Sequence, residues 1–124
     1  MISVVIPARN EEKYLPRTLR SLKKQDYKGE YEVIVVDNAS TDRTAVVAKK
    51  YGAKVVQEKH KGLTWARQKG FEASKGEIIA CLDADTNVLP SWLRLLDDAF
   101  KRNPKLAAVT GPLFTYDVKN KGTE

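Results

Sequence analysis

Short apolar runs alternate with amphipathic stretches along almost the whole chain, and this alternation limits its fold more than any other feature. Strands are expected at about 4–6, 33–36, 54–57, 78–82 and 106–110. Helices are expected between them, over about 11–25, 45–51, 63–74 and 90–100. Strands that alternate with helices predict an α/β fold, with a mostly parallel sheet and helices on both of its faces.

Proline, glycine and alanine residues indicate where the expected helices begin, end and pack closely. Pro16 fits the first helix only near its start, because an interior proline breaks the backbone hydrogen bonding. Gly52 is expected to end the second helix. The third helix is expected to pack closely through small residues: Ala66, Gly70 and Ala73.

Three of the expected strands end in polar clusters, at residues 7–12, 37–40 and 83–85. In a parallel sheet the carboxyl ends of the strands lie at one edge, where α/β proteins bind their ligands. The sequence contains neither a phosphate-binding Gly-x-x-x-x-Gly-Lys loop nor a Gly-x-Gly-x-x-Gly turn. A nucleotide would therefore be held by strand-end side chains, with its diphosphate on a metal ion.

Asp83 and Asp85 are separated by one residue and follow an apolar run that is expected to be a buried strand. Two carboxylates at such a place repel each other and lose hydration unless a cation lies between them. Their oxygen atoms suit Mg²⁺ or Mn²⁺. The alternative is that both are solvated loop carboxylates, one of which caps the next helix.

Composition favours one ordinary globular domain. The chain has 124 residues, 42% of them hydrophobic and 31% charged, and a formal net charge of +6. Its lysines are scattered, which is typical of solvated helix faces; attraction to an anionic membrane surface or to phosphorylated substrates is the functional alternative. Basic and aromatic residues do not interleave, so nucleic acid is not expected as a partner.

The single cysteine and the single histidine exclude further classes. One cysteine cannot form an internal disulfide, and Cys81 is expected to be a buried, inert thiol in a reducing compartment. We therefore expect a cytoplasmic protein. The positive net charge leaves peripheral contact with a membrane as the alternative. One histidine gives little support to a His-rich metal site or to a Ser-His-Asp triad.

Four segments in this order, 3–12, 33–42, 66–67 and 76–85, resemble the motifs of family-2 glycosyltransferases with the GT-A fold, a group of nucleotide-diphospho-sugar transferases. The resemblance covers residues 1 to about 116, which it implies are a Rossmann-like GT-A nucleotide-binding domain. Residues 117–124 are expected to be a polar tail.

The resemblance also implies roles for individual residues. Pro7 and Arg9 match positions that line the nucleoside pocket, and Glu11 matches one that contacts the base or ribose. Arg67 matches a helix arginine that reaches the diphosphate, or is simply a surface charge. The nucleotide-binding set implied in this way is Pro7, Ala8, Arg9, Glu11, Asp37, Asn38, Arg67, Asp83 and Ala84.

The same resemblance implies a divalent metal, Mg²⁺ or Mn²⁺, bound directly by Asp85. Asp83 would contact the ribose, or the metal through water. Where the family often has a second aspartate that bonds the base, this chain has Asn38, which leaves the donor open among UDP-, GDP- and dTDP-sugars. An amide both donates and accepts hydrogen bonds, whereas an ionised carboxylate only accepts.

Members of the family have a longer catalytic domain, whose second half carries the acceptor pocket and usually the catalytic base. No residue after Asp85 matches such a base: Asp97 and Asp98 fall in an expected helix and Asp117 in the expected tail. Three hypotheses follow: an inverting glycosyltransferase, a nucleotide-binding half-domain without transfer activity, or a basic peripheral protein with a vestigial acidic crevice. An uncovered apolar edge near 109–114 would favour a homo-oligomer.

Overall fold

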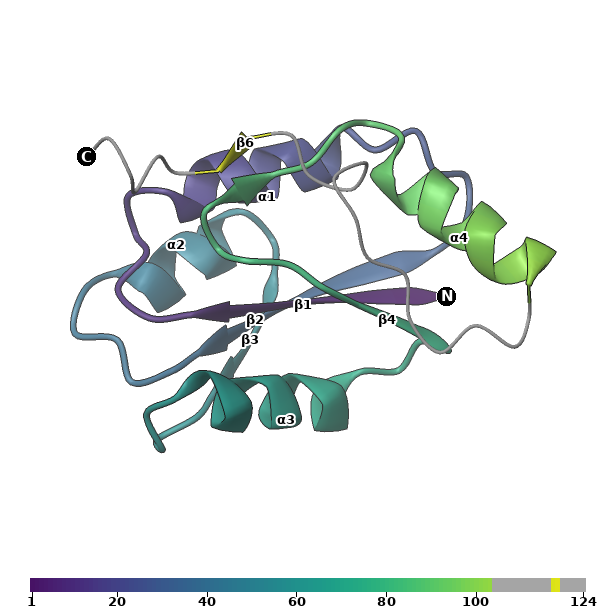
Figure 1. The fold of residues 1–124 in the computed structure, drawn as a ribbon. Coiled ribbons are helices and arrows are strands. Elements are labelled where there is room, and N and C mark those ends of the chain that lie inside the picture. The colour runs from purple at the N-terminus through teal and green to yellow at the C-terminus, as the bar shows by residue number, and fades with distance from the viewer. Residues whose placement is uncertain (104–116, 119–124) are drawn as a thin grey trace.

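The structure is a computed structural model that describes residues 1–103 and 117–118. Strands and helices alternate from the N-terminus onwards (Figure 1). The elements are β1 (Ile2–Ala8), α1 (Leu15–Lys23), β2 (Tyr31–Asp37), α2 (Thr44–Lys50), β3 (Lys54–Gln57), α3 (Leu63–Ala73), β4 (Ile78–Cys81), β5 (Thr86–Asn87), α4 (Trp92–Arg102) and β6 (Asp117–Val118).

The central sheet has four parallel strands in the order β3-β2-β1-β4. The register pairs Ala8 of β1 with Asp37 of β2, and Asp37 in turn with Gln57 of β3. The carboxyl ends of these strands therefore lie at one edge, as the alternation of strands and helices predicted. The predicted α/β fold with its parallel sheet is therefore confirmed.

Helices cover both faces of the sheet: α1, α2 and α4 lie on one side and α3 lies alone on the other (Figure 1). The larger core places apolar residues of α1, α2 and α4 against β1, including Leu19, Ala48 and Leu93. The smaller core places Ala66 of α3 against β1 and β2. A Cβ atom on Gly70 would run into the side chain of Val5, so the expected close-packing face of α3 is confirmed at Ala66 and Gly70.

Helix ends follow the local signals of the sequence, with one shift. Gly52 has φ +84° directly after α2, which is the left-handed conformation expected of a glycine that ends a helix. The first helix begins at Leu15 and not at Glu11, and Pro16 lies in its first turn. Residues before Leu15 form a separate turn, in which the Glu11 carbonyl accepts hydrogen bonds from the N–H groups of Tyr14 and Leu15.

Strand β4 is not the buried strand that its apolar sequence predicted. Ile79 is 41% exposed and Cys81 is also exposed, so the expectation of a buried thiol is wrong. Within the described residues β4 is the end strand of the sheet, and α3 packs mainly on β1, β2 and β3. The α3 face of β4 therefore lacks the helix cover that its neighbours have.

A second, two-stranded sheet pairs β5 with β6 in antiparallel fashion, Thr86 with Val118 and Asn87 with Asp117. Neither strand was expected, and the first residues of the expected tail, 117–118, belong to β6. The fifth predicted strand, 106–110, lies outside the described residues, as does the apolar edge expected near 109–114. In the described part of the chain, no helix has both the length and the apolar character needed to cross a bilayer.

Candidate functional site

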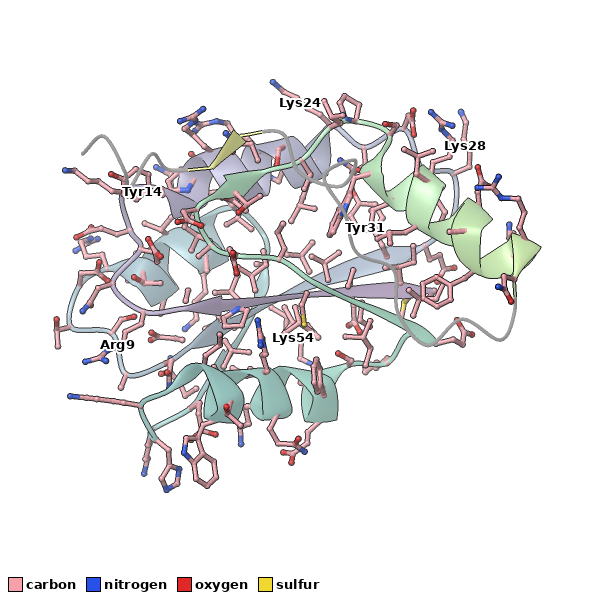
Figure 2. All side chains as sticks on the ribbon, in the orientation of Figure 1. Arg9, Tyr14, Lys24, Lys28, Tyr31 and Lys54 are labelled. Atoms are coloured by element: carbon pink, nitrogen blue, oxygen red, sulfur yellow. The ribbon has the colours of Figure 1, made fainter. Side chains whose placement is uncertain are left out.

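Four connecting segments meet at the carboxyl edge of the sheet: residues 9–14 after β1, 38–43 after β2, 58–62 after β3 and 82–85 after β4. Figure 2 shows Arg9 at this end of the molecule, with Lys28, which lies shortly before β2, towards the opposite end. All three polar clusters singled out in the sequence therefore belong to one edge.

Side-chain hydrogen bonds join the first two segments. The backbone N–H of Asn10 donates to Ser40 Oγ at 3.0 Å, and Asn10 Oδ1 accepts from the backbone N–H of Thr41 at 2.7 Å. The backbone N–H of Glu11 donates to Thr44 Oγ1 at 3.0 Å. The segment that carries Arg9 and Glu11 is thus held against the start of α2.

Asp42 strengthens this junction with both of its carboxylate oxygens. One accepts from the backbone N–H of Thr44 at 2.9 Å and also from its hydroxyl, and the other accepts from the backbone N–H of Glu12 at 3.3 Å. Burial alone would raise the pKa of Asp42, but the hydrogen bonds from Thr44 and Glu12 outweigh it and lower the pKa below its ordinary value.

Asp37 and Asn38 end β2 as buried polar residues, 6% and 4% exposed. Asp37 Oδ1 accepts from the backbone N–H of Ser40 at 3.2 Å, which closes a tight turn through Ala39 at φ +58°. This turn aims the following segment towards α2 and leaves Asp37 at the base of the site.

Asn38 uses its amide to fix the segment after β3. Its Nδ2 donates to the carbonyls of Glu58 at 3.1 Å and His60 at 2.7 Å, and its Oδ1 accepts from the backbone N–H of Gly62 at 2.9 Å. Both amide hydrogens are thereby used. Asn38 is a positioning residue for this segment. A nucleotide base could interact with its side chain only by donating a second hydrogen bond to Oδ1.

Asp83, Ala84 and Asp85 form a turn that is anchored at its middle. The Thr18 hydroxyl of α1 donates to the Ala84 carbonyl at 2.8 Å, and the N–H of Thr86 donates to the Asp83 carbonyl at 3.1 Å. Ala84 is 3% exposed, whereas Asp83 is exposed and Asp85 partly so. The two carboxylates therefore lie on the solvent side of a turn whose central residue faces the core.

Cys81 ends β4, and its thiol responds to charges on two neighbouring elements. Atoms packed around the Cys81 sulfur withdraw it partly from water and raise the pKa of the thiol; Arg67 of α3 opposes this rise and Asp83 adds to it. The helix arginine and the first aspartate of the pair therefore both act on the end of β4.

The structure divides the expected nucleotide-binding residues by accessibility. The exposed ones are Arg9, Arg67 and Asp83; the partly buried ones are Pro7, Glu11 and Asp85; the buried ones are Ala8, Asp37, Asn38 and Ala84. Ala8 and Ala84 use their carbonyls within the protein, on the Asn38 N–H and the Thr18 hydroxyl. A ligand would meet these two residues only at other backbone atoms.

Among the described residues, no three His, Cys, Asp or Glu side chains are grouped closely enough to hold a metal ion by themselves. The Asp83 and Asp85 pair supplies two carboxylates on one turn. Mg²⁺ is commonly bound through one or two carboxylates together with substrate phosphates. The donor set therefore fits a cation that is completed by a diphosphate.

The sequence reading missed the segment after β3. His60 stacks on Trp65, with ring centroids 4.6 Å apart, and its Nδ1 lies 2.9 Å from Glu58 Oε2. Gly62, directly before α3, has φ +139°, a conformation that is open to glycine. Gly62 is the sequence feature that could have indicated this segment, since a glycine immediately before a helix is typical of a chain reversal.

Comparison with known proteins agrees with this geometry. The family described as "Glycosyl transferase family 2" matches residues 3–123. AglE, a glycosyltransferase of Haloferax volcanii, is 35% identical over 99 residues, which cover 74% of this chain and 33% of AglE. The chain thus spans about a third of that relative.

Two solved structures superimpose well on this one. Staphylococcus aureus TarS in complex with UDP gives a TM-score of 0.77 at 33% identity, over 83% of this chain and 32% of the TarS chain. The mannosyltransferase PcManGT of Pyrobaculum calidifontis, in complex with GDP-Man and Mn²⁺, gives 0.79 at 26% identity, over 90% and 36%. With a family match across nearly its whole length and a relative of this similarity, the chain belongs to glycosyl transferase family 2.

Proposed function

We propose that this chain binds a nucleotide-diphospho-sugar at the carboxyl edge of its sheet and supplies the donor half of a glycosyltransferase site. The observation that carries the proposal is the turn anchored at Ala84, which leaves Asp83 exposed and Asp85 partly exposed at the carboxyl edge of the sheet. Two carboxylates on one turn suit a cation that is completed by the oxygens of a diphosphate.

In this proposal Asp85 holds Mg²⁺ or Mn²⁺ directly, and Asp83 contacts the ribose, or the metal through water. When bound, the cation offsets the negative charge of the diphosphate leaving group. Support comes from PcManGT, whose structure contains GDP-Man with Mn²⁺, and from a mycobacterial glucosyl-3-phosphoglycerate synthase, whose structure contains UDP with Mn²⁺.

The nucleoside would lie against Pro7, Arg9 and Asp37, with Glu11 near the base or ribose. The planar guanidinium of Arg9 is exposed and can stack on a base. UDP and GDP complexes both occur among the superimposable structures, so the donor is proposed as a UDP-, GDP- or dTDP-sugar.

Calorimetric titration of the chain with UDP or GDP, with and without Mn²⁺, tests the proposal. We expect Asp85→Asn to abolish metal-dependent binding, because an amide is a poorer ligand for a hard cation, and Asp83→Asn to weaken it. Asp26→Asn is the matched control: Asp26 is an exposed carboxylate in a surface ion pair with Arg94. Unchanged affinity in Asp85→Asn would refute the metal site.

One observation favours the half-domain alternative, in which the chain binds the donor without transferring sugar. Helix α4, which carries Asp97 and Asp98, lies at the opposite end of the molecule from Arg9 (Figures 1 and 2). Neither of these carboxylates is therefore placed at the candidate site, where a base would have to act. Transfer would then require residues beyond the described part or another chain.

A further inference from the structure

The segment that joins β3 to α3 ends in a tip, residues 59–65, in which every residue is exposed. It includes two large apolar side chains, Leu63 at 51% and Trp65 at 52% exposure. In Figure 1 this connection is the teal loop at the lower left, before α3, at the end of the sheet that carries the candidate site. Such exposure places apolar surface in water without visible benefit to the fold.

The fold holds the tip in place. Asn38 fixes the backbone of Glu58, His60 and Gly62 through three hydrogen bonds, and Glu58 accepts from the backbone N–H of His60 at 2.9 Å. The His60 ring then stacks on Trp65. The indole is therefore supported in its outward position by contacts that begin in the buried end of β2.

Positive charge surrounds the apolar pair. Lys59 and Lys61 belong to the tip, and Lys69 follows one helical turn after Trp65 on α3, while residues 59–71 contain no aspartate or glutamate. The flanking carboxylates have partners of their own: Glu58 bonds His60 and Glu72 accepts from Gln68 at 3.1 Å. The tip thus combines a basic rim with apolar side chains that point into solvent.

We propose that the tip docks on the surface of an anionic phospholipid bilayer. Leu63 and Trp65 would enter the boundary between headgroups and acyl chains, where tryptophan is favoured because its ring is apolar and its N–H is polar. Lys59 and Lys61 would lie at the headgroup phosphates, to which basic residues near the membrane are attracted. A second copy of the chain fits less well, because two basic tips would repel each other.

Docking would also orient the site. Asn38 joins the tip to the end of β2, so the tip and the candidate nucleotide site share one edge of the sheet. If the proposed donor site is correct, this edge would face the membrane, and an acceptor carried by a lipid would be presented to it. The docking itself is independent of the nucleotide and is tested without it.

Tryptophan fluorescence gives a direct readout, because the chain has two tryptophans and the other, Trp92, is 2% exposed. Vesicles of phosphatidylcholine alone and with 30% phosphatidylglycerol are added to the full chain. We expect a blue shift only with the anionic vesicles, weakened by salt. Trp65→Phe removes the reporting indole, so loss of the shift in this variant assigns the signal to Trp65 and not to Trp92. The joint substitution Lys59→Gln and Lys61→Gln should weaken vesicle binding roughly 25-fold, about fivefold for each lysine.

The matched controls lie on α2, where Val46 is 51% exposed and Lys49 and Lys50 are exposed. Val46→Ser, and Lys49→Gln with Lys50→Gln, should leave binding nearly unchanged, whereas Leu63→Ser should reduce it. Equal losses on α2 and in the tip would mean that the net charge alone drives binding, and would overturn the proposal. So would the absence of a shift with anionic vesicles, or a shift that depends on protein concentration when no vesicles are present.

Discussion

Asn38 shows how one amide can decide the shape of a ligand-binding edge. Its two N–H bonds reach carbonyls at Glu58 and His60, and its oxygen accepts from Gly62. Only an amide can donate twice and accept once in this place. An aspartate at this position would set a carboxylate oxygen against two carbonyl oxygens, so the exchange is not conservative here.

We therefore expect Asn38→Asp to lower the free energy of unfolding by about 2 kcal/mol, through two lost donors and the repulsion that replaces them. Urea denaturation at pH 7 measures this loss. Asn10→Asp is the matched control, because Asn10 also bonds the neighbouring segment but does so through its oxygen. Unchanged stability together with an altered preference among UDP, GDP and dTDP would instead identify Asn38 as a contact of the base.

At this scale the sequence located the residues of the edge but not what each one does. Asn38 was expected to face the nucleoside, and the structure gives most of its hydrogen bonds to a segment twenty and more residues away. Cys81 was expected to be buried and is exposed. Both depend on which strands and loops become neighbours, and a one-dimensional pattern does not contain that information.

At the scale of elements, Asp42 is the tie between the segment after β1 and the start of α2. Its carboxylate accepts from Thr44 and Glu12, and these bonds lower its pKa despite its partial burial. A carboxyl group whose pKa is lower in the folded protein stabilises the fold above its unfolded pKa of about 3.9. That contribution is lost as the pH falls through the folded pKa.

We expect Asp42→Asn to cost about 1 kcal/mol of stability at pH 7, as is usual for the loss of a capping carboxylate. The difference from the wild type should be constant above pH 5 and should narrow as the pH falls below about 4, where the unfolded carboxyl takes up a proton more readily than the folded one. Denaturation with urea from pH 3 to pH 7 follows it. Asp26→Asn, in an exposed ion pair, should change little; a gap for Asp42→Asn that does not narrow between pH 5 and pH 3 would contradict the ionic account.

Long elements with a repeating apolar pattern were predictable from the sequence, whereas very short ones were not. The helical spacing of Trp92, Leu95, Leu96 and Phe100 predicted α4. The structure buries Trp92 and Leu96 of this set, together with Leu93. β5 and β6 have two residues each, which is too short to show an alternating pattern in the sequence. They are recognised as strands only because they pair with each other. The first helix was predicted four residues too early, since the turn before Leu15 shares its polarity with a helix start.

At the scale of the whole molecule, the share of the relatives' length that this chain covers bears on whether it can transfer sugar as well as bind the donor. It covers 33% of AglE and 32% of the TarS chain, and Asp97 and Asp98 of α4 lie away from the candidate site. Donor binding and sugar transfer should therefore separate in the isolated chain. Self-association stays a prediction, because the apolar edge expected near 109–114 lies outside the described residues.

We expect the purified chain to bind UDP or GDP with Mn²⁺ and yet to show no efficient transfer to water or to added acceptors. Release of nucleotide from UDP- and GDP-sugars is the assay, with metal-dependent binding as the positive control for a folded site. Robust turnover would contradict it. Sedimentation over a range of concentrations tests the accompanying expectation of a dimer or larger assembly, which a monomer at high micromolar concentration would remove.

The strand order has a consequence for how this chain is made. β1 leaves the ribosome before the other three strands of this sheet but ends in its middle, between β2 and β4, with Ile2 paired to both Tyr31 and Ile78. At synthesis rates of about 5–20 residues per second, one side of this apolar strand waits roughly 4–14 s for its partner. Throughout that interval the nascent chain exposes an open strand edge, and the turn that carries Asp83 and Asp85 has not yet been synthesised.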